Sequence, residues 1–246
     1  MPIVLAVLTL ALQIYFIVHV FRTGRPYWWA FVILSAPVIG ALFYYFLEIY
    51  PGSKEERDAH KLVKNVVKSL KPDETLKRRA EELETCGSVD NKVALAEECS
   101  RAGMHEEAVK LYQSALHGPY AKDSHIRFQL TNALLDNGSA SQARGLIADI
   151  RADDPAFRKT ELALLEARAL QGSGDAHGAV AIYEKLVPDS VGLETRTRYG
   201  LLLKELGHTK QAQGVFADVV THAKRFRIQH TEERAWLEAA ERELGL

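Results

Sequence analysis

Two short stretches of the sequence come close to motifs that carry chemistry. Residues 172–177, GSGDAH, resemble the glycine-rich turn G-x-G-x-x-G, whose backbone amides cradle a phosphate, but His177 replaces the last glycine and no strand precedes the turn. Residues 105–109, HEEAV, lack the second histidine of the zinc-binding pattern H-E-x-x-H, because position 109 is valine. We therefore expect neither nucleotide binding nor zinc-dependent hydrolysis at these positions.

The other residue types that could form a reactive site are scattered. The nine histidines form no cluster in the sequence, and the two cysteines, Cys86 and Cys99, do not form a C-x-x-C pair. The chain carries 31 basic and 32 acidic residues, so it has no global positive field that would attract nucleic acid. The sequence therefore predicts a protein that is not an enzyme, with no cofactor, no metal site and no nucleic-acid partner.

The polar part of the chain contains an internal repeat. Each repeat has a helical stretch, a turn with a glycine and a second helical stretch. The turn glycines are 35, 36 and 33 residues apart: Gly103, Gly138, Gly174 and Gly207. Five residues after each glycine comes an alanine, and four residues later a bulky side chain: Ala108 and Tyr112, Ala143 and Ile147, Ala179 and Tyr183, Ala212 and Phe216. A small residue allows two helices to cross closely, and the bulky residue packs into the neighbouring repeat.

This pattern resembles the tetratricopeptide repeat over about residues 89–222. The small residue of the first helix is Ala96, Thr131, Ala167 and Gly200, whereas the tryptophan usual in that helix is missing throughout. The resemblance implies an all-α solenoid of about four repeats over residues 89–228, with a concave groove. Residues 229–246 are expected to form a capping helix, with Thr231 as the N-cap and Trp236 covering the last repeat.

In tetratricopeptide domains, ligands usually lie against the first helix of each pair. On that basis the groove of this chain would be lined by Glu97, Arg101, His125, Phe128, Asn132, Leu164, Arg168, Gln171, Thr197, Arg198, Leu201 and Lys204. Asn132 matches a residue that hydrogen-bonds the ligand in many peptide-binding members, and Phe128 stands where those members usually have lysine. Arg168, Arg198 and Lys204 are expected to receive an acidic segment or a C-terminus. For each residue singly, a solvated helix face is the alternative interpretation.

The first fifty residues contrast with the rest, because they hold only three charged side chains. Residues 2–20 and 28–47 are apolar runs, and about 20 helical residues cross a hydrocarbon core of roughly 30 Å. Gly24 and Pro26 mark a tight turn between the runs. We therefore predict a transmembrane helical hairpin over residues 1–50. A cleaved signal peptide is the competing interpretation of the first run, which lacks a basic region at its start.

The second run resembles the two-helix membrane module of bacterial cardiolipin synthases. The resemblance rests on the pattern W-x7-P-x2-G-x3-Y, formed by Trp29, Pro37, Gly40 and Tyr44. Those enzymes also need H-x-K-x4-D repeats, and the nearest stretch here, HAKRFRIQ over residues 222–229, occurs once and has Gln229 in place of the aspartate. The resemblance therefore implies a membrane anchor without the enzyme. A helix contact inside the membrane is predicted at Gln13, Ala36, Pro37 and Gly40.

Residues 51–88 are predicted to contain a basic amphipathic helix over 54–71, which could lie on membrane lipids or pack on the repeats, and a short helix over 74–85. Six basic residues follow the second run and two lie between the runs, so the C-terminal part is predicted to be cytoplasmic. Together these expectations describe a bacterial inner-membrane scaffold that binds a protein or peptide partner in its groove. The alternative is a non-catalytic accessory of phospholipid or envelope biogenesis that acts through its hairpin.

Overall fold

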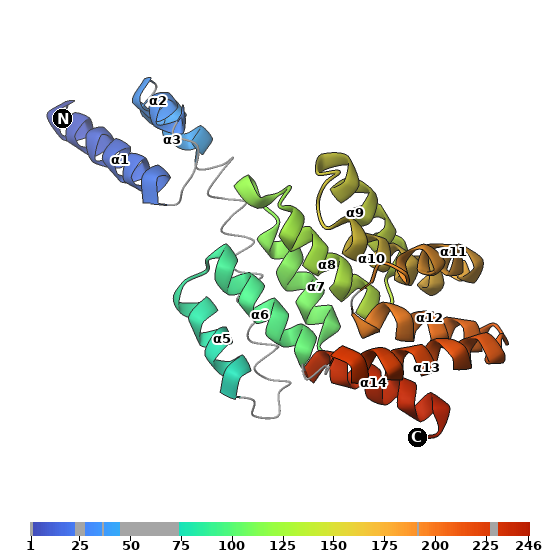
Figure 1. The fold of residues 1–246 in the computed structure, drawn as a ribbon. Coiled ribbons are helices and arrows are strands. Elements are labelled where there is room, and N and C mark those ends of the chain that lie inside the picture. The colour runs from blue at the N-terminus through green and yellow to red at the C-terminus, as the bar shows by residue number, and fades with distance from the viewer. Residues whose placement is uncertain (1, 23–27, 36, 45–73, 191, 227–230) are drawn as a thin grey trace. The chain divides into compact units, whose positions relative to one another are not determined.

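The computed structural model describes residues 2–22, 28–35, 37–44, 74–190, 192–226 and 231–246 (Figure 1). Within these residues the regular secondary structure is helical and contains no β-strand, which confirms the prediction of an all-α chain. The chain divides into two compact units, residues 1–126 and residues 127–246.

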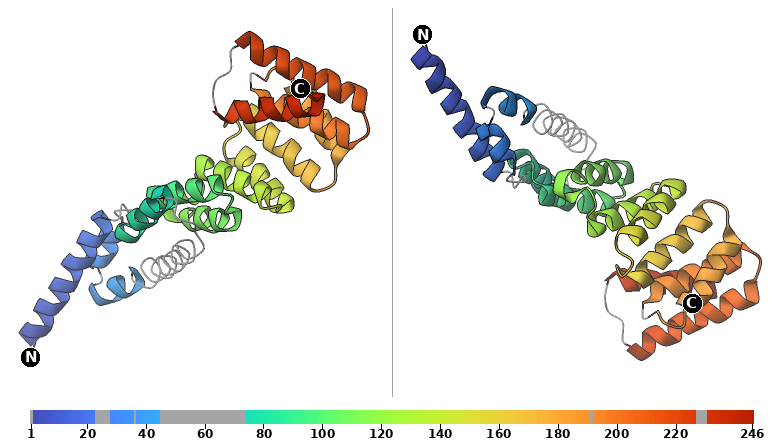
Figure 2. Two further views of the ribbon diagram at one scale, coloured as in Figure 1. Left: turned by 90° about the horizontal axis from the view of Figure 1, so that it is seen from below. Right: turned by 90° about the horizontal axis from the view of Figure 1, so that it is seen from above.

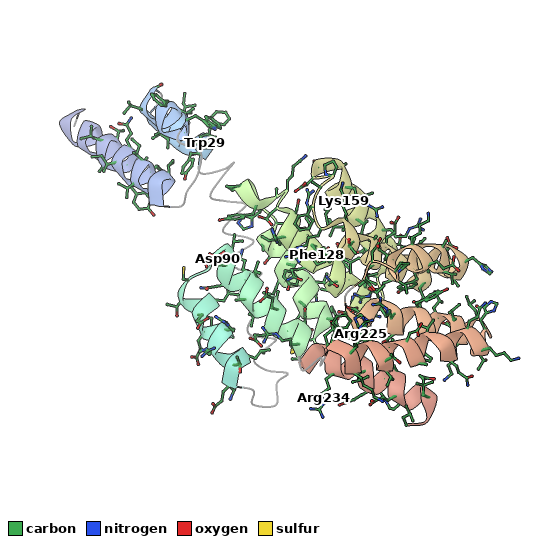
Figure 3. All side chains as sticks on the ribbon, viewed as in Figure 1. Trp29, Asp90, Phe128, Lys159, Arg225 and Arg234 are labelled. Carbon is green, nitrogen blue, oxygen red and sulfur yellow. The ribbon has the colours of Figure 1, made fainter. Side chains whose placement is uncertain are left out.

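Three apolar helices open the first unit and pack on one another: α1 (Pro2–Arg22), α2 (Trp28–Ser35) and α3 (Pro37–Tyr44). The ring of Tyr44 lies edge-on to the rings of Phe16 and Trp29, with centroid distances of 5.8 Å and 5.4 Å (Trp29 is labelled in Figure 3). The amide of Gln13 on α1 donates a hydrogen bond to the carbonyl oxygen of Ile33 on α2 at 3.0 Å, so the predicted interhelical bond is present. Large apolar side chains on these helices are exposed: Leu10, Tyr15, Phe31, Leu34, Ile39 and Phe43.

The second apolar run forms two helices, and the prediction of one helix over residues 28–47 is wrong. The interruption falls at position 36, between α2 and α3. Pro37 has no backbone N–H, and a proline disfavours helical geometry in the residue before it. Each helix has eight residues, which corresponds to a length of about 12 Å. The two helices approach closely at Gly40, where an added Cβ would lie 2.4 Å from the carbonyl oxygen of Val32.

Among the residues that the structure describes, no helix combines the length and the apolar character needed to cross a lipid bilayer. This finding contradicts the predicted location, a bacterial inner-membrane protein with two spanning helices and a cytoplasmic C-terminal domain. The membrane hairpin, its resemblance to the cardiolipin synthase module and the lipid contacts are likewise unsupported, and the alternative role that depends on the hairpin loses its basis. The predicted basic helix over 54–71 and the side chains of Ala36 and Pro37 lie outside the described residues.

The rest of the first unit contains α5 (Glu74–Thr85), α6 (Val89–Arg101), α7 (His105–Ala115) and the short 3₁₀ helix η2 (Gly118–Tyr120). Helix α5 occupies the range predicted for a short helix and packs on α6, which in turn packs on α7. Ser88 begins α6 as its N-cap, because its hydroxyl accepts a hydrogen bond from the amide of Asn91 at 3.2 Å.

The second unit is a series of helices that pack mainly on their neighbours in the chain (Figure 1). They are α8 (Ser124–Asp136), α9 (Ala140–Asp153), α10 (Lys159–Gly172), α11 (Ala176–Leu186), α12 (Leu193–Glu205), α13 (Thr209–Phe226) and α14 (Thr231–Leu244). Helix α14 lies against both α12 and α13, as predicted for a capping helix (Figure 2). Trp236 packs there on the cluster that includes Leu193, Leu203 and Phe216. The side chain of Thr231 is outside the described residues.

The turn glycines end the first helices in the same way. Gly103, Gly138, Gly174 and Gly207 have positive φ angles, between 75° and 85°. At Gly174 its own amide donates to the carbonyl oxygen of Gln171 at 3.0 Å, and the amide of Asp175 donates to that of Leu170 at 2.9 Å. The other three turns repeat both bonds. This is the Schellman motif, whose left-handed residue favours glycine because glycine has no Cβ to clash.

The small and bulky positions of the repeat are buried in both units. The three sets of positions identified in the sequence expose at most 2% of their surface where a value is given: Ala96, Thr131, Ala167, Ala108, Ala143, Ala179, Ala212, Tyr112, Ile147, Tyr183 and Phe216. The tightest crossing is at Gly200, where an added Cβ would lie 2.6 Å from Cε1 of Phe216. The helices therefore meet where the sequence placed its smallest side chains.

Candidate functional site

Side chains from the first helices of three successive repeats meet around a pocket in the second unit. The pocket has a volume of about 350 Å³. Its lining comes from α8, α10 and α12 and from the turns that follow α8 and α10: Leu135, Asp136, Gly138, Ala140, Arg168, Gln171, Gly172 and Arg198. Three of the residues predicted to line the groove, Arg168, Gln171 and Arg198, are among them.

Arg168 occupies the centre of a hydrogen-bond network between α8 and α10. Its Nη1 donates to Oδ1 of Asn132 at 3.0 Å, and its Nη2 donates to Oδ1 of Asp136 at 2.7 Å. Only 11% of the Arg168 side chain is exposed, whereas 39% of the Asp136 side chain is exposed. Burial lowers the pKa of Arg168 below its ordinary value, and the neighbouring charge of Arg198 acts in the same direction, while Asp136 and Glu194 oppose the change.

Arg198 connects the pocket to the capping helix. Its Nε donates to Oε1 of Glu194 at 2.7 Å, one turn earlier on α12. Its guanidinium lies over the ring of Trp236 on α14, 4.5 Å from the ring centroid, which is a favourable cation–π distance. Two ion or hydrogen-bond pairs lie further along the same face: Gln171 donates to Glu205 at 3.3 Å, and Lys204 pairs with Glu243.

Tyr183 places a polar group in the core of the same unit. The residue is fully buried among Ala167, Leu170 and Leu202, and no described atom accepts a hydrogen bond from its hydroxyl. Burial raises the pKa of Tyr183 to about 12, although the charges of Arg198 and Arg168 lower it and that of Glu194 raises it further.

Two of the predicted groove residues on α8 are engaged with neighbouring side chains. Phe128, labelled in Figure 3, is 9% exposed, and its ring lies edge-on to Phe157 with the centroids 6.0 Å apart. The guanidinium of Arg158 covers that ring at 5.2 Å from its centroid. The amide of Asn132 donates to the carbonyl oxygen of Phe128 at 3.3 Å, in addition to the bond from Arg168. Phe128 therefore belongs to the packed interior rather than to an open surface.

The other predicted groove residues do not line the pocket. In the second unit, Thr197 is completely buried and its hydroxyl donates to the carbonyl oxygen of Trp236 at 3.4 Å. Leu164 and Leu201 are partly buried and pack on the core. Three further residues lie in the first unit: Arg101 is exposed and pairs with Glu98 at 2.7 Å, Glu97 is half-buried, and His125 is exposed.

Asp136 is the one charged residue of the pocket that sequence reasoning missed. It lies four residues after Asn132 on α8, so the helical period places it on the same face. That spacing was visible in the sequence and could have identified it. Within the described part of the chain, no three histidine, cysteine, aspartate or glutamate side chains come together in a way that could hold a metal ion.

Comparison with known proteins finds similarity to solved structures only. No protein-family model matches the sequence, and no curated protein matches it. Among solved structures, MamA RS-1, as its ArsTM double mutant, has 14% sequence identity and a TM-score of 0.49, and the match covers 70% of this chain and 96% of that chain. YrrB, a TPR protein with an unusual peptide-binding site, has 14% identity and a TM-score of 0.41, with 67% and 91% of the two chains covered. MamA MSR-1 has 18% identity and a TM-score of 0.41, with 63% and 95% covered.

Proposed function

We propose that this protein is a non-catalytic interaction module that holds a peptide segment of a partner protein against α8, α10 and α12. The observation that carries the proposal is the pocket in which Asp136, Arg168, Gln171 and Arg198 converge from these three helices. First helices of successive repeats present side chains at regular intervals, which suits an extended segment that crosses them.

The polar groups around the pocket fit this role. Gln171 carries both a donor and an acceptor, and its only printed bond within the described residues, to Glu205, is long at 3.3 Å. An amide of this kind can pair with the backbone N–H and C=O groups of a bound segment. The apolar part of the lining, Leu135 and Ala140, would cover the carbon atoms of the same segment.

Site-specific photo-crosslinking tests the proposal. A benzophenone amino acid would replace Gln171 in the pocket or, as a matched control, Ala181, which is exposed on the second helix α11. We expect a partner to be crosslinked in intact cells from position 171 and not from position 181. Equal crosslinking from both positions, or none from position 171, would contradict the proposed function.

A further inference from the structure

The charged side chains that line the pocket do not balance. Two of them are cationic, Arg168 and Arg198, and one is anionic, Asp136. The lining therefore carries one more positive than negative charge. A single negative group brought in by a partner would neutralise the excess, and a guanidinium binds a carboxylate well because its N–H groups form a planar fork.

Arg168 already shows which acceptors this site takes. The two ends of its fork are occupied by an amide oxygen of Asn132 and a carboxylate oxygen of Asp136. Asp136 lies in the last residue of α8 and more than a third of its side chain is exposed, so its carboxylate can turn into solvent without unpacking the helix. The position on Nη2 can then be taken by another carboxylate at little electrostatic cost.

We infer that the pocket binds an aspartate or glutamate side chain of the partner segment, which displaces Asp136 from Arg168 and is shared between Arg168 and Arg198. The inference rests on the proposed function, since it names the group that the segment inserts. The lowered pKa of Arg168 agrees with it: burial and Arg198 disfavour the charged guanidinium more than Asp136 and Glu194 favour it. An additional anion would therefore stabilise this cation.

Selection from a random peptide library tests the inference. A library of 12-residue peptides would be displayed on phage with each C-terminus joined to the coat protein, so that only side-chain carboxylates are available. The library would be selected on the immobilised full chain and, in parallel, on Arg168→Gln. We expect peptides with aspartate or glutamate to be enriched on the natural protein and to be lost on the variant.

Affinity measurements then assign the contact to atoms. One enriched peptide would be synthesised as its C-terminal amide, together with an analogue in which glutamine or asparagine replaces the acidic residue. Fluorescence anisotropy should show binding at least about tenfold weaker for the analogue, and about tenfold weaker for Arg168→Gln and Arg198→Gln, as expected for the loss of a charge-assisted hydrogen bond. Arg144→Gln, which changes an exposed arginine on α9, is the matched control and should leave the affinity unchanged.

A gain of affinity separates this contact from simple unfolding. Asp136→Asn removes the internal competitor, so it should tighten binding of the acidic peptide by about threefold or more. A misfolded variant would not bind more tightly.

Enriched peptides that lack acidic residues and bind Arg168→Gln equally well would overturn the inference and leave the proposed function standing. Binding that is unchanged or weakened by Asp136→Asn would also overturn it. If no peptide is enriched, both the inference and the proposed function fail.

Discussion

Replacing Gly200 by alanine should reveal how closely the last helix pair is packed. Gly200 lies in the interior of α12, and an added Cβ would stand 2.6 Å from Cε1 and 3.0 Å from Cδ1 of Phe216 on α13. Real Cβ atoms essentially never come within 3.0 Å of a neighbour, so something must move. The ring has little room to do so, because Phe216 is 1% exposed and belongs to a cluster with Leu193, Leu203 and Ala212.

Two opposing effects set the size of the change. Alanine is a better helix former than glycine, which stabilises a helix interior by about 1 kcal/mol. Overpacking a buried contact costs about 1–3 kcal/mol. We therefore expect Gly200→Ala to lower the free energy of unfolding by up to about 2 kcal/mol. Gly214→Ala is the matched control, because Gly214 is exposed in the interior of α13 with nothing within 4 Å of an added Cβ, and only the favourable effect of about 1 kcal/mol applies there.

Urea unfolding followed by circular dichroism would measure both variants. The midpoint should fall for Gly200→Ala and rise for Gly214→Ala, with unchanged slopes. Phe216→Leu in the Gly200→Ala background should recover part of the loss, since the smaller side chain makes room; the coupling between the two sites should reach about 1 kcal/mol. If Gly200→Ala is as stable as Gly214→Ala, the close crossing of α12 and α13 does not exist in solution.

Three further predictions concern single groups. Glu233→Ala should lower the free energy of unfolding by about 1 kcal/mol in urea, because Oε2 of Glu233 accepts a hydrogen bond from the amide of Leu193 at 2.8 Å and thereby caps α12, whose N-cap is a glycine. The raised pKa of Tyr183, about 12 against an ordinary value of 10, means that the unfolded chain releases this proton first; its stabilising contribution is complete below pH 10 and is lost as the pH rises towards 12, so Tyr183→Phe should lose less stability over that interval in a pH series of urea unfolding curves. Cys86 is exposed, whereas Cys99 is buried with a pKa raised to about 12, so iodoacetamide at pH 8 should label Cys86 alone until urea is added, as mass spectrometry would show.

The positions of the turns and of the helix crossings could be predicted because each depends on local chemistry. A helix that ends in the Schellman motif needs a left-handed residue, and Gly174 supplies it with φ of 85°. Ala179 and Tyr183 then follow at fixed intervals on the next helix, and the period of the helix alone places them on its inward face. Such patterns are written within a few residues of sequence.

The division of the second apolar run could not be predicted in the same way. Pro37 was visible, but a proline can either kink a helix or end it, and the sequence alone favoured a kink. The choice depends on contacts made after folding. In the structure, the backbone of α3 comes close to that of α2 at Gly40, which a continuous helix would not allow.

The candidate site was only partly predictable because helical spacing identifies a face and not its neighbours. Arg168 and Arg198 were placed on the correct face, but their partners come from other helices. Thr197 lies one residue before Arg198 and is buried, because α14 covers that side of α12 and takes its hydroxyl in a hydrogen bond. The spacing within one helix carries no information about where a capping helix will lie.

The missing tryptophans of the first helices have a physical counterpart in the structure. In the tetratricopeptide pattern the tryptophan stands four residues before the small position, and here that place is taken by Lys92, Arg127 and Arg196 in three of the repeats. Each cation reaches the C-terminal part of a second helix or the segment after it: Lys92 donates to the carbonyl oxygen of Ser114 at 3.1 Å, Arg127 pairs with Asp153 at 2.7 Å, and Arg196 donates to the carbonyl oxygen of Ser190 at 2.5 Å. Carbonyl groups at such ends lack intrahelical partners and carry the negative end of the helix dipole, so a cation is stabilised there. Long basic side chains can also cover the apolar surface that a tryptophan would have covered, because their carbon chains pack along the helix while the charged end reaches a carbonyl or a carboxylate. The repeat can therefore keep its helix pairing without its most recognisable residue.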